Sequence, residues 1–332
     1  MKSILIVPIN NYAWNQFIAD EIVSLLSPCF QNVNTVNLYP VDSEKDCFKN
    51  KKCQLTDYSI AQSVSIYMSG HEIDGLVPDL ILQPFETGDA ILYRDTTHCA
   101  RIACGSMMSD NELHKCADKL GVSSSIIKQI AWLSGVRVEN VQGILLAGGK
   151  SLRMGTDKAS LPLGETTLVA SLAEMLKLWC DNLLVSIAKG KQSPLENVQV
   201  VVDKHDESGP LAGICSALTE THSRVSLVVA CDIPYIHPML IRKMLSFCNE
   251  YDIVVPSFKT DTVEPLMAVY TKACLGKIEI LLDRKRYRVK DLFNMCKTKT
   301  VTWSDNAWYA NLNTWDEYNA YCNTNMMKTH NK

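Results

Sequence analysis

The 332-residue sequence has no excess of basic charge. Its 33 lysines and arginines stand against 36 aspartates and glutamates, which gives a formal net charge of −3. Proteins that bind nucleic acid neutralise backbone phosphates with clustered lysine and arginine. We therefore expect no nucleic-acid partner, and any binding of phosphate must depend on a few local cations.

The sequence also lacks an apolar run of about 18 residues, the length from which a transmembrane helix is recognised. The first stretch, "MKSILIVPINNYAW", contains only a short apolar run, and no small-residue cleavage site follows it. It therefore does not have the pattern of a secretory signal peptide. We expect no membrane association and a cytoplasmic location.

Two cysteine patterns are missing. The 13 cysteines are odd in number and scattered, which argues against a secreted disulfide framework. No C-x-x-C pair occurs, and the nearest approach to a metal-ligand pattern is the set Cys47, Cys53, His98, Cys99 and Cys104. Structural zinc sites draw on more regular spacings. We therefore expect reduced thiols that pack as small apolar groups.

Apolar strands and helical patterns alternate from about Val141 onward. The predicted strands cover 141–149, 181–188, 198–203, 224–236, 251–258 and 265–273, and the predicted helices cover 166–180, 209–220 and 238–250. Thr166 or Thr167 is a suitable N-cap for the first of these helices. This alternation predicts a mostly parallel sheet covered by helices, in which ligands collect at the carboxyl ends of the strands.

The first part of the chain has a weaker pattern of the same kind. Strands are predicted at 3–9 and 78–85 and a helix at 15–30, and a pair of short helices over 110–136 precedes the boundary. The pair could be a helix-turn-helix, but basic residues that would read a groove are sparse, so we favour two surface helices packed on a core. We expect a smaller α/β domain over 1–137 with an accessory or docking role, and a larger domain over 140–325.

The segment "VQGILLAGGKSLRMGTDKASLPL", which begins at Val141, carries the clearest chemistry. Gly148 and Gly149 after a strand allow close approach of the backbone to a ligand and turn N–H groups toward an anion. Arg153 and Lys158 add positive charge suited to phosphate. The segment satisfies neither the Walker A pattern nor the G-x-G-x-x-G spacing of dinucleotide-binding folds.

Two aspartates stand at the ends of predicted strands. Asp203 follows "QVVV", and Asp232 follows the very apolar "SLVVAC". Mg²⁺ in nucleotide sites is bound by one or two carboxylates together with substrate phosphates. The sequence therefore predicts a nucleotide site at this edge of the sheet, with Mg²⁺ as cofactor.

These segments together resemble the molybdenum cofactor guanylyltransferase family of nucleotidyltransferases, which have a Rossmann-like fold. The resemblance covers about residues 140 to 320 and continues in order through "DESGPLAGICSAL", "CDIPYI", "EPLMAVY" and "NLNTWDEY". The implied function is transfer of GMP from GTP to molybdopterin, with release of pyrophosphate. Because the acceptor is already an anionic phosphate, positioning and charge neutralisation would do most of the catalysis.

The resemblance implies a role for each matching residue. The implied catalytic residues are Arg153, Lys158 and Asp232, with Asp232 also holding Mg²⁺. The implied nucleotide-binding residues are Leu146, Ala147, Gly148, Gly149, Lys158, Asp203 and Asp232. The implied residues of the pterin side are Arg286, Asn311 and Asn313. For Asn311 and Asn313 a role as caps of the last helix is the alternative.

One position departs from the family pattern. An asparagine that contacts the nucleotide often follows the second strand, but this sequence reads "LLVSIAKGK", with Ala188 near the expected position. Ser186 and Lys189 are the candidates to replace it.

Two other functions stay open from the sequence. One is a cytidylyltransferase of the same cofactor, although "GPLAG" favours GTP. The other is a non-catalytic protein that binds the nucleotide or cofactor and delivers it to a molybdoenzyme, although Lys158 and Asp232 are both present. Expected partners beyond GTP and molybdopterin are molybdoenzyme apoproteins or other proteins of cofactor biosynthesis.

Overall fold

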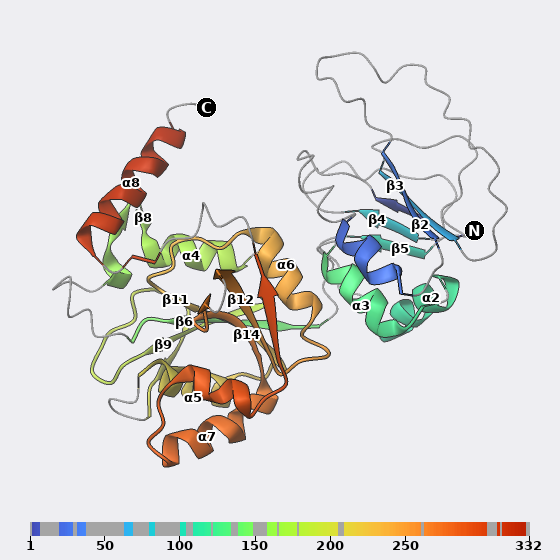
Figure 1. Ribbon diagram of the computed structural model, residues 1–332. Helices are drawn as coiled ribbons and strands as arrows, with labels where there is room; N and C mark the ends of the chain where they lie inside the picture. The colour runs from blue at the N-terminus through green and yellow to red at the C-terminus, as the bar shows by residue number, and fades with distance from the viewer. Residues whose placement is uncertain are drawn as a thin grey trace. The chain divides into compact units, whose positions relative to one another are not determined.

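The computed structural model divides the chain into two compact units, Met1–Glu139 and Asn140–Lys332 (Figure 1). The residues it describes are 2–6, 20–28, 32–37, 63–68, 80–83, 100–103, 109–120, 122–133, 139–148, 158–164, 166–177, 179–204, 209–259, 262–303, 311–312 and 314–329. Within these ranges, the helices are all too short or too polar to cross a membrane.

The N-terminal unit contains a five-stranded sheet in the order β2-β3-β1-β4-β5, with every neighbouring pair parallel. The strands are β1 (Lys2–Ile6), β2 (Asn32–Asn37), β3 (Ser63–Met68), β4 (Leu80–Gln83) and β5 (Ala100–Ala103). The sequence predicts β1 and β4, which are apolar. It misses β2, β3 and β5, which are short or alternate with polar residues such as the asparagines of "NVNTVN".

The predicted helix pair is α2 (Asp110–Leu120) and α3 (Ser124–Leu133), and α2 packs against both α3 and β5. A capping box starts α2, because Ser109 N donates to Glu112 Oε2 at 2.8 Å and Glu112 N donates to Ser109 Oγ at 3.4 Å. Ile127 and Ile130 of α3 are fully buried. A helix that buries its apolar face in this way supports packing on a core rather than groove reading.

The C-terminal unit is built on an eight-stranded mixed sheet in the order β10-β9-β6-β11-β14-β12-β13, with β15 paired to β12. The strands are β6 (Val141–Leu146), β9 (Asn182–Ile187), β10 (Gln199–Val202), β11 (Val225–Ala230), β12 (Ile253–Lys259), β13 (Thr262–Val263), β14 (Met267–Thr271) and β15 (Thr298–Thr302). Strands β10, β9, β6 and β11 are parallel, β14 is antiparallel to both β11 and β12, and β15 is parallel to β12. The predicted mostly parallel sheet is confirmed.

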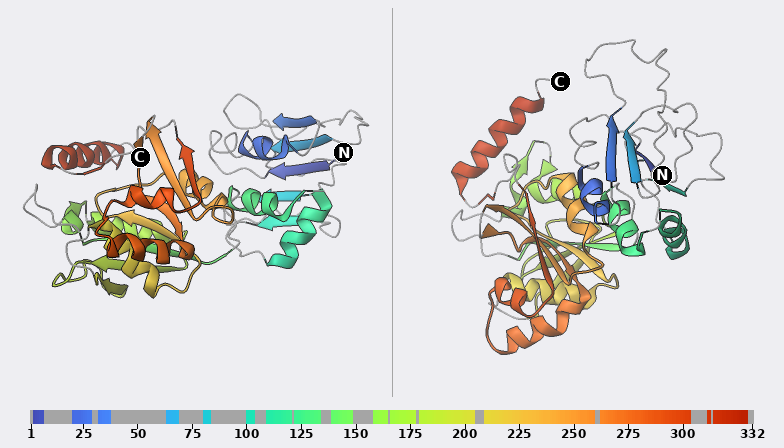
Figure 2. Two further views of the ribbon diagram at one scale, coloured as in Figure 1. Left: turned by 60° about the horizontal axis from the view of Figure 1, so that its bottom comes forward. Right: turned by 45° about the vertical axis from the view of Figure 1, so that its right-hand side comes forward.

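Helices cover both faces of this sheet. Figures 1 and 2 show α4 and α6 on one face and α5 and α7 on the other. Their bounds are α4 (Leu168–Lys177), α5 (Pro210–Glu220), α6 (Pro238–Ser246) and α7 (Leu275–Asp283). The core under α5 and α7 is continuous, because fully buried Ile214, Tyr270 and Ile278 belong to one apolar cluster. Burying these apolar faces is what fixes the helices on the sheet.

The predicted helix starts are found where the capping chemistry places them. Thr167 Oγ1 accepts from Ala170 N at 3.2 Å, so Thr167 caps α4, and α5 begins at Pro210 after Gly209. Gly209 has φ of 67°, a left-handed conformation that glycine adopts without strain. The segment "LLDRKRYRVKDLF", which contains Arg286, forms the end of α7, an exposed turn and the 3-10 helix η3 (Val289–Asn294).

The last helix, α8 (Trp315–Thr329), is joined to the short hairpin β7 (Pro162–Leu163) and β8 (Thr166–Thr167). Tyr318 Oη donates to the carbonyl of Pro162 at 2.5 Å. Buried Leu312 packs with Leu161 and Leu168 beneath it. The chain around the start of α8 is thus held beside the β7–β8 hairpin and the start of α4.

Candidate functional site

The end of β6 is bound to the strands on both sides of it. Ala147 N donates to the carbonyl of Ser186 at 2.8 Å, and Cys231 N donates to the carbonyl of Leu146 at 3.2 Å. These bonds extend the parallel ladder past the ends of β6, β9 and β11, so three chain segments leave the sheet side by side. Ligands of open α/β sheets bind at this edge.

Two glycines bring backbone close to one carboxylate. A Cβ on Gly148 would lie 3.0 Å from Ala188 N and 3.2 Å from Asp203 Oδ2. A Cβ on Gly213 of α5 would lie 2.9 Å from Ser186 Oγ and 3.4 Å from Asp203 Oδ1. No larger residue fits at either position without displacing Asp203 or its hydrogen-bond donor. The sequence did not predict the close packing of Gly213 against Ser186 and Asp203, although Gly213 is the last residue of the "GPLAG" segment.

Asp203 is held by the strand beside it. Its N–H donates to the carbonyl of Ile187 at 2.9 Å, and Ser186 Oγ donates to Asp203 Oδ1 at 2.6 Å. Burial raises the pKa of the Asp203 carboxyl, and the hydrogen bond from Ser186 acts in the opposite direction. Ser186, a buried candidate to replace the missing asparagine, is thus hydrogen-bonded to a predicted site residue.

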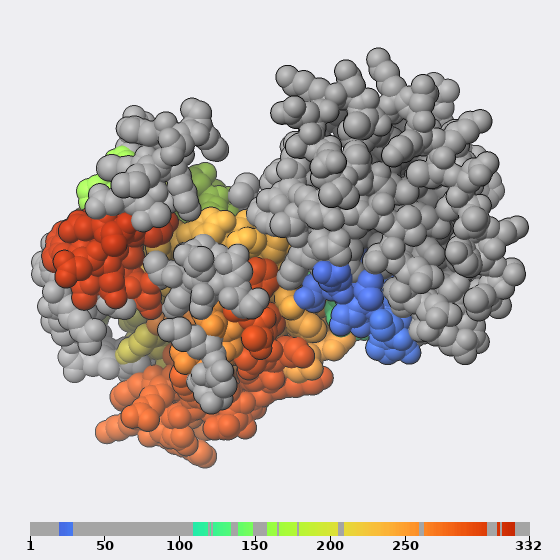
Figure 3. Space-filling model, turned by 45° about the horizontal axis from the view of Figure 1, so that its top comes forward, coloured from blue at the N-terminus to red at the C-terminus, as the bar shows by residue number. Residues whose placement is uncertain are grey.

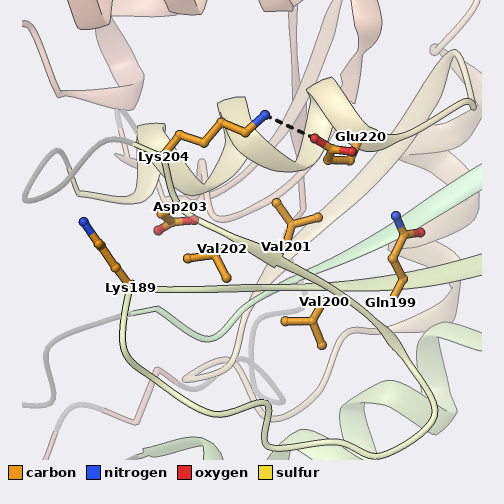
Figure 4. A pocket seen from close by; sticks show the side chains of 8 residues that line it. All are labelled: Lys189, Gln199, Val200, Val201, Val202, Asp203, Lys204 and Glu220. Atoms are coloured by element: carbon orange, nitrogen blue, oxygen red, sulfur yellow. Dashed lines mark hydrogen bonds and ion pairs between the residues drawn. The ribbon is translucent and has the colours of Figure 1, made fainter.

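A pocket opens beside Asp203, along the outermost strand β10. It has a volume of about 540 Å³ and is lined by Asp203, Lys189, Lys204, Glu220 and the strand β10 (Figure 4). Lys204 and Glu220 form an ion pair at 3.2 Å across it. Predicted site residue Asp203 therefore faces open space that a ligand group can enter.

Lys158 and Asp232 lie together, although 74 positions separate them in sequence. Lys158 Nζ is 3.4 Å from Asp232 Oδ2, and their side chains are 15% and 24% exposed. Lys158 begins the 3-10 helix η1 (Lys158–Ser160), and Asp232 lies in the turn after β11. The structure thus joins a cation from the loop after β6 to the carboxylate predicted at the end of β11.

The chain before α8 reaches the same point. Leu312 N donates to the carbonyl of Asp232 at 2.8 Å, which places Asn311 one residue from the Asp232 backbone. The Asn311 Oδ1 atom is buried and has no hydrogen-bond partner among the residues that the structure describes. It does not cap α8, because Thr314 and Glu317 form the capping box there, with Thr314 N donating to Glu317 Oε2 at 2.9 Å. A buried carbonyl oxygen without a donor marks a place where a ligand's N–H or O–H can bind.

Arg286, the other predicted residue of the pterin side, has a different environment. It lies in the exposed turn 284–288 after α7, its side chain is 55% exposed, and its Nε donates to Asp291 at 3.0 Å. The contacts described for it tie the guanidinium to its own segment, not to Asp232 or Asp203. Three further predicted site residues, Gly149, Arg153 and Asn313, lie outside the described residues, as do the cysteines and histidine at 47, 53, 98, 99 and 104.

Asp232 has the chemistry required of a Mg²⁺ ligand. It is a partly exposed carboxylate at a strand end, and one or two such groups with substrate phosphates suffice for this ion. Over the described part of the chain, no group of three or more His, Cys, Asp or Glu side chains forms a dedicated metal cage. The residues present fit a metal held mainly by a nucleotide's phosphates.

Residues 143–299 match the model of the MobA-like NTP transferase domain. A probable molybdenum cofactor guanylyltransferase of Pelotomaculum thermopropionicum is 35% identical over 160 residues, which are 48% of this chain and 78% of that protein. This chain belongs to the molybdenum cofactor guanylyltransferase family. Its C-terminal unit is a nucleotidyltransferase, as the sequence predicts.

A second relative and one solved structure are also similar to this chain. A molybdenum cofactor guanylyltransferase of Desulfosudis oleivorans is 30% identical over 171 residues, or 50% of this chain and 82% of that protein. A solved structure, molybdopterin-guanine dinucleotide biosynthesis protein A from Archaeoglobus fulgidus, is 20% identical; the match covers 56% of this chain and 99% of that one, with a TM-score of 0.49. The matched family region, 143–299, lies within the C-terminal unit.

Proposed function

We propose that this guanylyltransferase-family protein transfers GMP from GTP to molybdopterin and releases pyrophosphate. The observation that carries the proposal is the Lys158–Asp232 pair, 3.4 Å apart at the end of β11, with the Asn311 segment bonded to the Asp232 backbone. A cation and a carboxylate thus lie together, and a segment with a buried acceptor atom is bonded to the backbone of the carboxylate residue. The names of the relatives support the choice of GTP and of the acceptor.

The reaction requires little proton transfer. A phosphate oxygen of molybdopterin bonds to the α-phosphorus of GTP, the bond from that phosphorus to the bridging oxygen breaks, and pyrophosphate leaves. The nucleophile is already an anion, so no general base is needed, and catalysis comes from alignment and neutralisation of charge. In this proposal Lys158 binds phosphate, and Asp232 holds Mg²⁺, which supplies further positive charge to the phosphates when bound.

We assign the base of the nucleotide to the Asp203 side of the site. A carboxylate offers two acceptor oxygens and no donor. Guanine presents two adjacent N–H groups on its pairing edge, whereas cytosine presents an amino group next to a ring-nitrogen acceptor. Asp203, oriented by Ser186 and approached closely by Gly148, therefore favours GTP over CTP.

We assign the acceptor to the side of Asn311. The unpartnered Oδ1 of Asn311 is a buried acceptor, and pterins carry several N–H donors. The bond from Leu312 N to the Asp232 carbonyl fixes this residue beside the proposed metal ligand. Molybdopterin bound there would present its phosphate to a nucleotide held on Lys158. For residues 1–137 we retain the proposal of an accessory or docking role.

The test is a turnover assay with the full-length protein, Mg²⁺ and molybdopterin, with GTP and CTP supplied separately. The proposal predicts pyrophosphate release with GTP and a product heavier than molybdopterin by one GMP unit. Faster turnover with CTP would replace it with cytidylyl transfer. Binding of GTP without pyrophosphate release would favour the non-catalytic, cofactor-delivering function instead.

A further inference from the structure

A pair of cysteines lies at the opposite edge of the sheet from the nucleotide site. Cys274 ends the 3-10 helix η2 (Lys272–Cys274) and N-caps α7, and Cys296 follows η3. Their Sγ atoms are 3.7 Å apart, and neither is in a disulfide. Asp252, near Cys274, comes directly before β12, and Thr298, two residues after Cys296, begins β15. These two strands are parallel, so the cysteine pair lies at their amino ends. Asp203 and Asp232 lie at the carboxyl ends.

The residue Asp252 holds both cysteines in place. Cys274 Sγ donates to the Asp252 carbonyl at 3.4 Å. Next to Cys296, Lys297 N donates to Asp252 Oδ2 at 3.1 Å, and Asp252 N donates to the Lys297 carbonyl at 2.8 Å. The chain segments that carry the two thiols are therefore anchored to one residue, and their contact does not depend on a loose side chain alone.

The two thiols differ in chemical character. The hydrogen bond between Cys296 and Cys274 lowers the pKa of Cys296, and the nearby Lys277 ammonium adds to this effect. The same hydrogen bond, together with burial, raises the pKa of Cys274. Cys296 is also half-buried, whereas Cys274 is fully buried. Cys296 is therefore the thiol that an external reagent can reach and that ionises more readily, and Cys274 is the thiol placed to react after it.

We propose that Cys274 and Cys296 form a reversible disulfide by exchange with a small-molecule disulfide such as oxidised glutathione. The Cys296 thiolate attacks one sulfur of the reagent, and one glutathione leaves as thiolate and takes up a proton. Cys274 then loses its proton and attacks Cys296 Sγ, and the second glutathione leaves. Two protein thiols are oxidised and the reagent disulfide is reduced to two thiols. The inference does not depend on the proposed transferase reaction.

The bond would join the ends of a surface segment. The chain between the two cysteines contains α7, the exposed turn 284–288 and η3, and this part of the chain is coloured orange on the surface in Figure 3. Formation of a covalent S–S bond of about 2.0 Å requires the sulfurs to approach by less than the width of one atom. Closing this segment restricts the unfolded chain, so the oxidised protein should resist heat better than the reduced one.

The test is disulfide mapping on the full-length protein. The protein is incubated with oxidised glutathione, remaining thiols are alkylated, and peptides are identified by mass spectrometry without reduction. The expected product is a peptide pair joined through Cys274 and Cys296, lighter by two hydrogens than its parts and separated by reductant. Stable glutathione on Cys296, alkylation of both thiols, or linkage of either to another cysteine would overturn the proposal.

Matched variants sharpen this test. Cys274→Ser and Cys296→Ser should each abolish the linked pair, while Cys322→Ser, in α8, should retain it. Oxidation should raise the Tm of wild type by about 5 °C and leave that of Cys296→Ser unchanged. A linked wild-type protein with an unchanged Tm would contradict the claim that the bond constrains α7 and η3.

Discussion

Asp203 and Asp232 follow the parallel strands β10 and β11 of one sheet, and their surroundings differ. Asp232 lies 3.4 Å from a lysine ammonium and is partly exposed. Asp203 accepts a hydrogen bond from Ser186, and the backbone at Gly148 and Gly213 approaches it closely. The first environment suits a carboxylate used for its charge, and the second suits one used for the direction of its oxygens.

We propose that this difference assigns two tasks to the two aspartates. Charge acts over several ångströms and tolerates movement, so Asp232 and Lys158 can work from a turn and a short 3-10 helix. Hydrogen-bond recognition fails with small displacements, so Asp203 is fixed by its neighbours on β9 and α5. In our account, catalysis depends on the first aspartate and choice of base on the second.

The largest expected effect is that of Asp232→Ala. Removal of the proposed metal ligand should lower kcat by about 1,000-fold, because stabilisation of phosphate charge in the transition state is lost. Pyrophosphate release with saturating GTP measures this change. Full turnover by the variant would remove Asp232 from the metal site and end the proposed contrast between the aspartates.

The next effect is that of Lys158→Ala. Loss of the ammonium should reduce kcat/KM for GTP by about 100-fold, since a point charge on phosphate acts in both binding and catalysis. Lys158→Arg is the matched control and should recover part of the activity, because it restores charge with a different shape. Equal activity of the alanine and arginine variants would contradict a role for charge at this position.

Asp203→Asn is expected to weaken binding of GTP, a smaller effect than those above, without lowering stability at neutral pH. KM for GTP should rise about 10-fold, since a hydrogen bond to a charged acceptor contributes about 1.5–3 kcal/mol. Stability at neutral pH should not fall: because burial raises the pKa of Asp203, the folded state favours its protonated form, and ionisation as pH rises opposes folding. Thermal unfolding from pH 4 to 8 checks this sign. A variant that loses stability as pH rises, relative to wild type, would contradict it.

The smallest predicted effect concerns the crowding around Asp203. Gly213→Ala should destabilise the protein by about 1–2 kcal/mol, because the new Cβ would lie 2.9 Å from Ser186 Oγ and 3.3 Å from Leu146 Cδ2. Gly276→Ala in α7 meets no atom within 4 Å and is the matched control. It should stabilise by about 0.5–1 kcal/mol through helix propensity alone. Urea unfolding of both variants separates crowding from propensity, and equal shifts would refute the crowding.

Much of the C-terminal unit can be predicted from the sequence, for a local reason. Apolar runs such as "SLVVA" and caps such as Thr167 are patterns of residues close together in sequence, so they predict strands and helix starts directly. The contact between Lys158 and Asp232 follows less directly, from the rule that parallel strands end at one edge. The family resemblance then adds chemical roles that spacing does not supply.

Other features depend on tertiary structure. The position of the buried Asn311 Oδ1 depends on the hydrogen bond between Leu312 and Asp232, which are far apart in sequence. The contact of Cys274 with Cys296 requires β15 to return parallel to β12. Neither pairing leaves a local pattern, and short polar strands such as β2 also lack one. Sequence periodicity detects burial within an element, but it does not show which elements meet.

The most direct test of the contrast is a steady-state comparison of Asp203→Asn and Asp232→Ala with GTP and molybdopterin. The account predicts a separation: Asp203→Asn raises KM for GTP and keeps kcat within a few-fold, whereas Asp232→Ala lowers kcat and changes KM little. The reverse pattern, or an equal loss of kcat in both variants, would contradict the division of recognition and catalysis between the two strand ends.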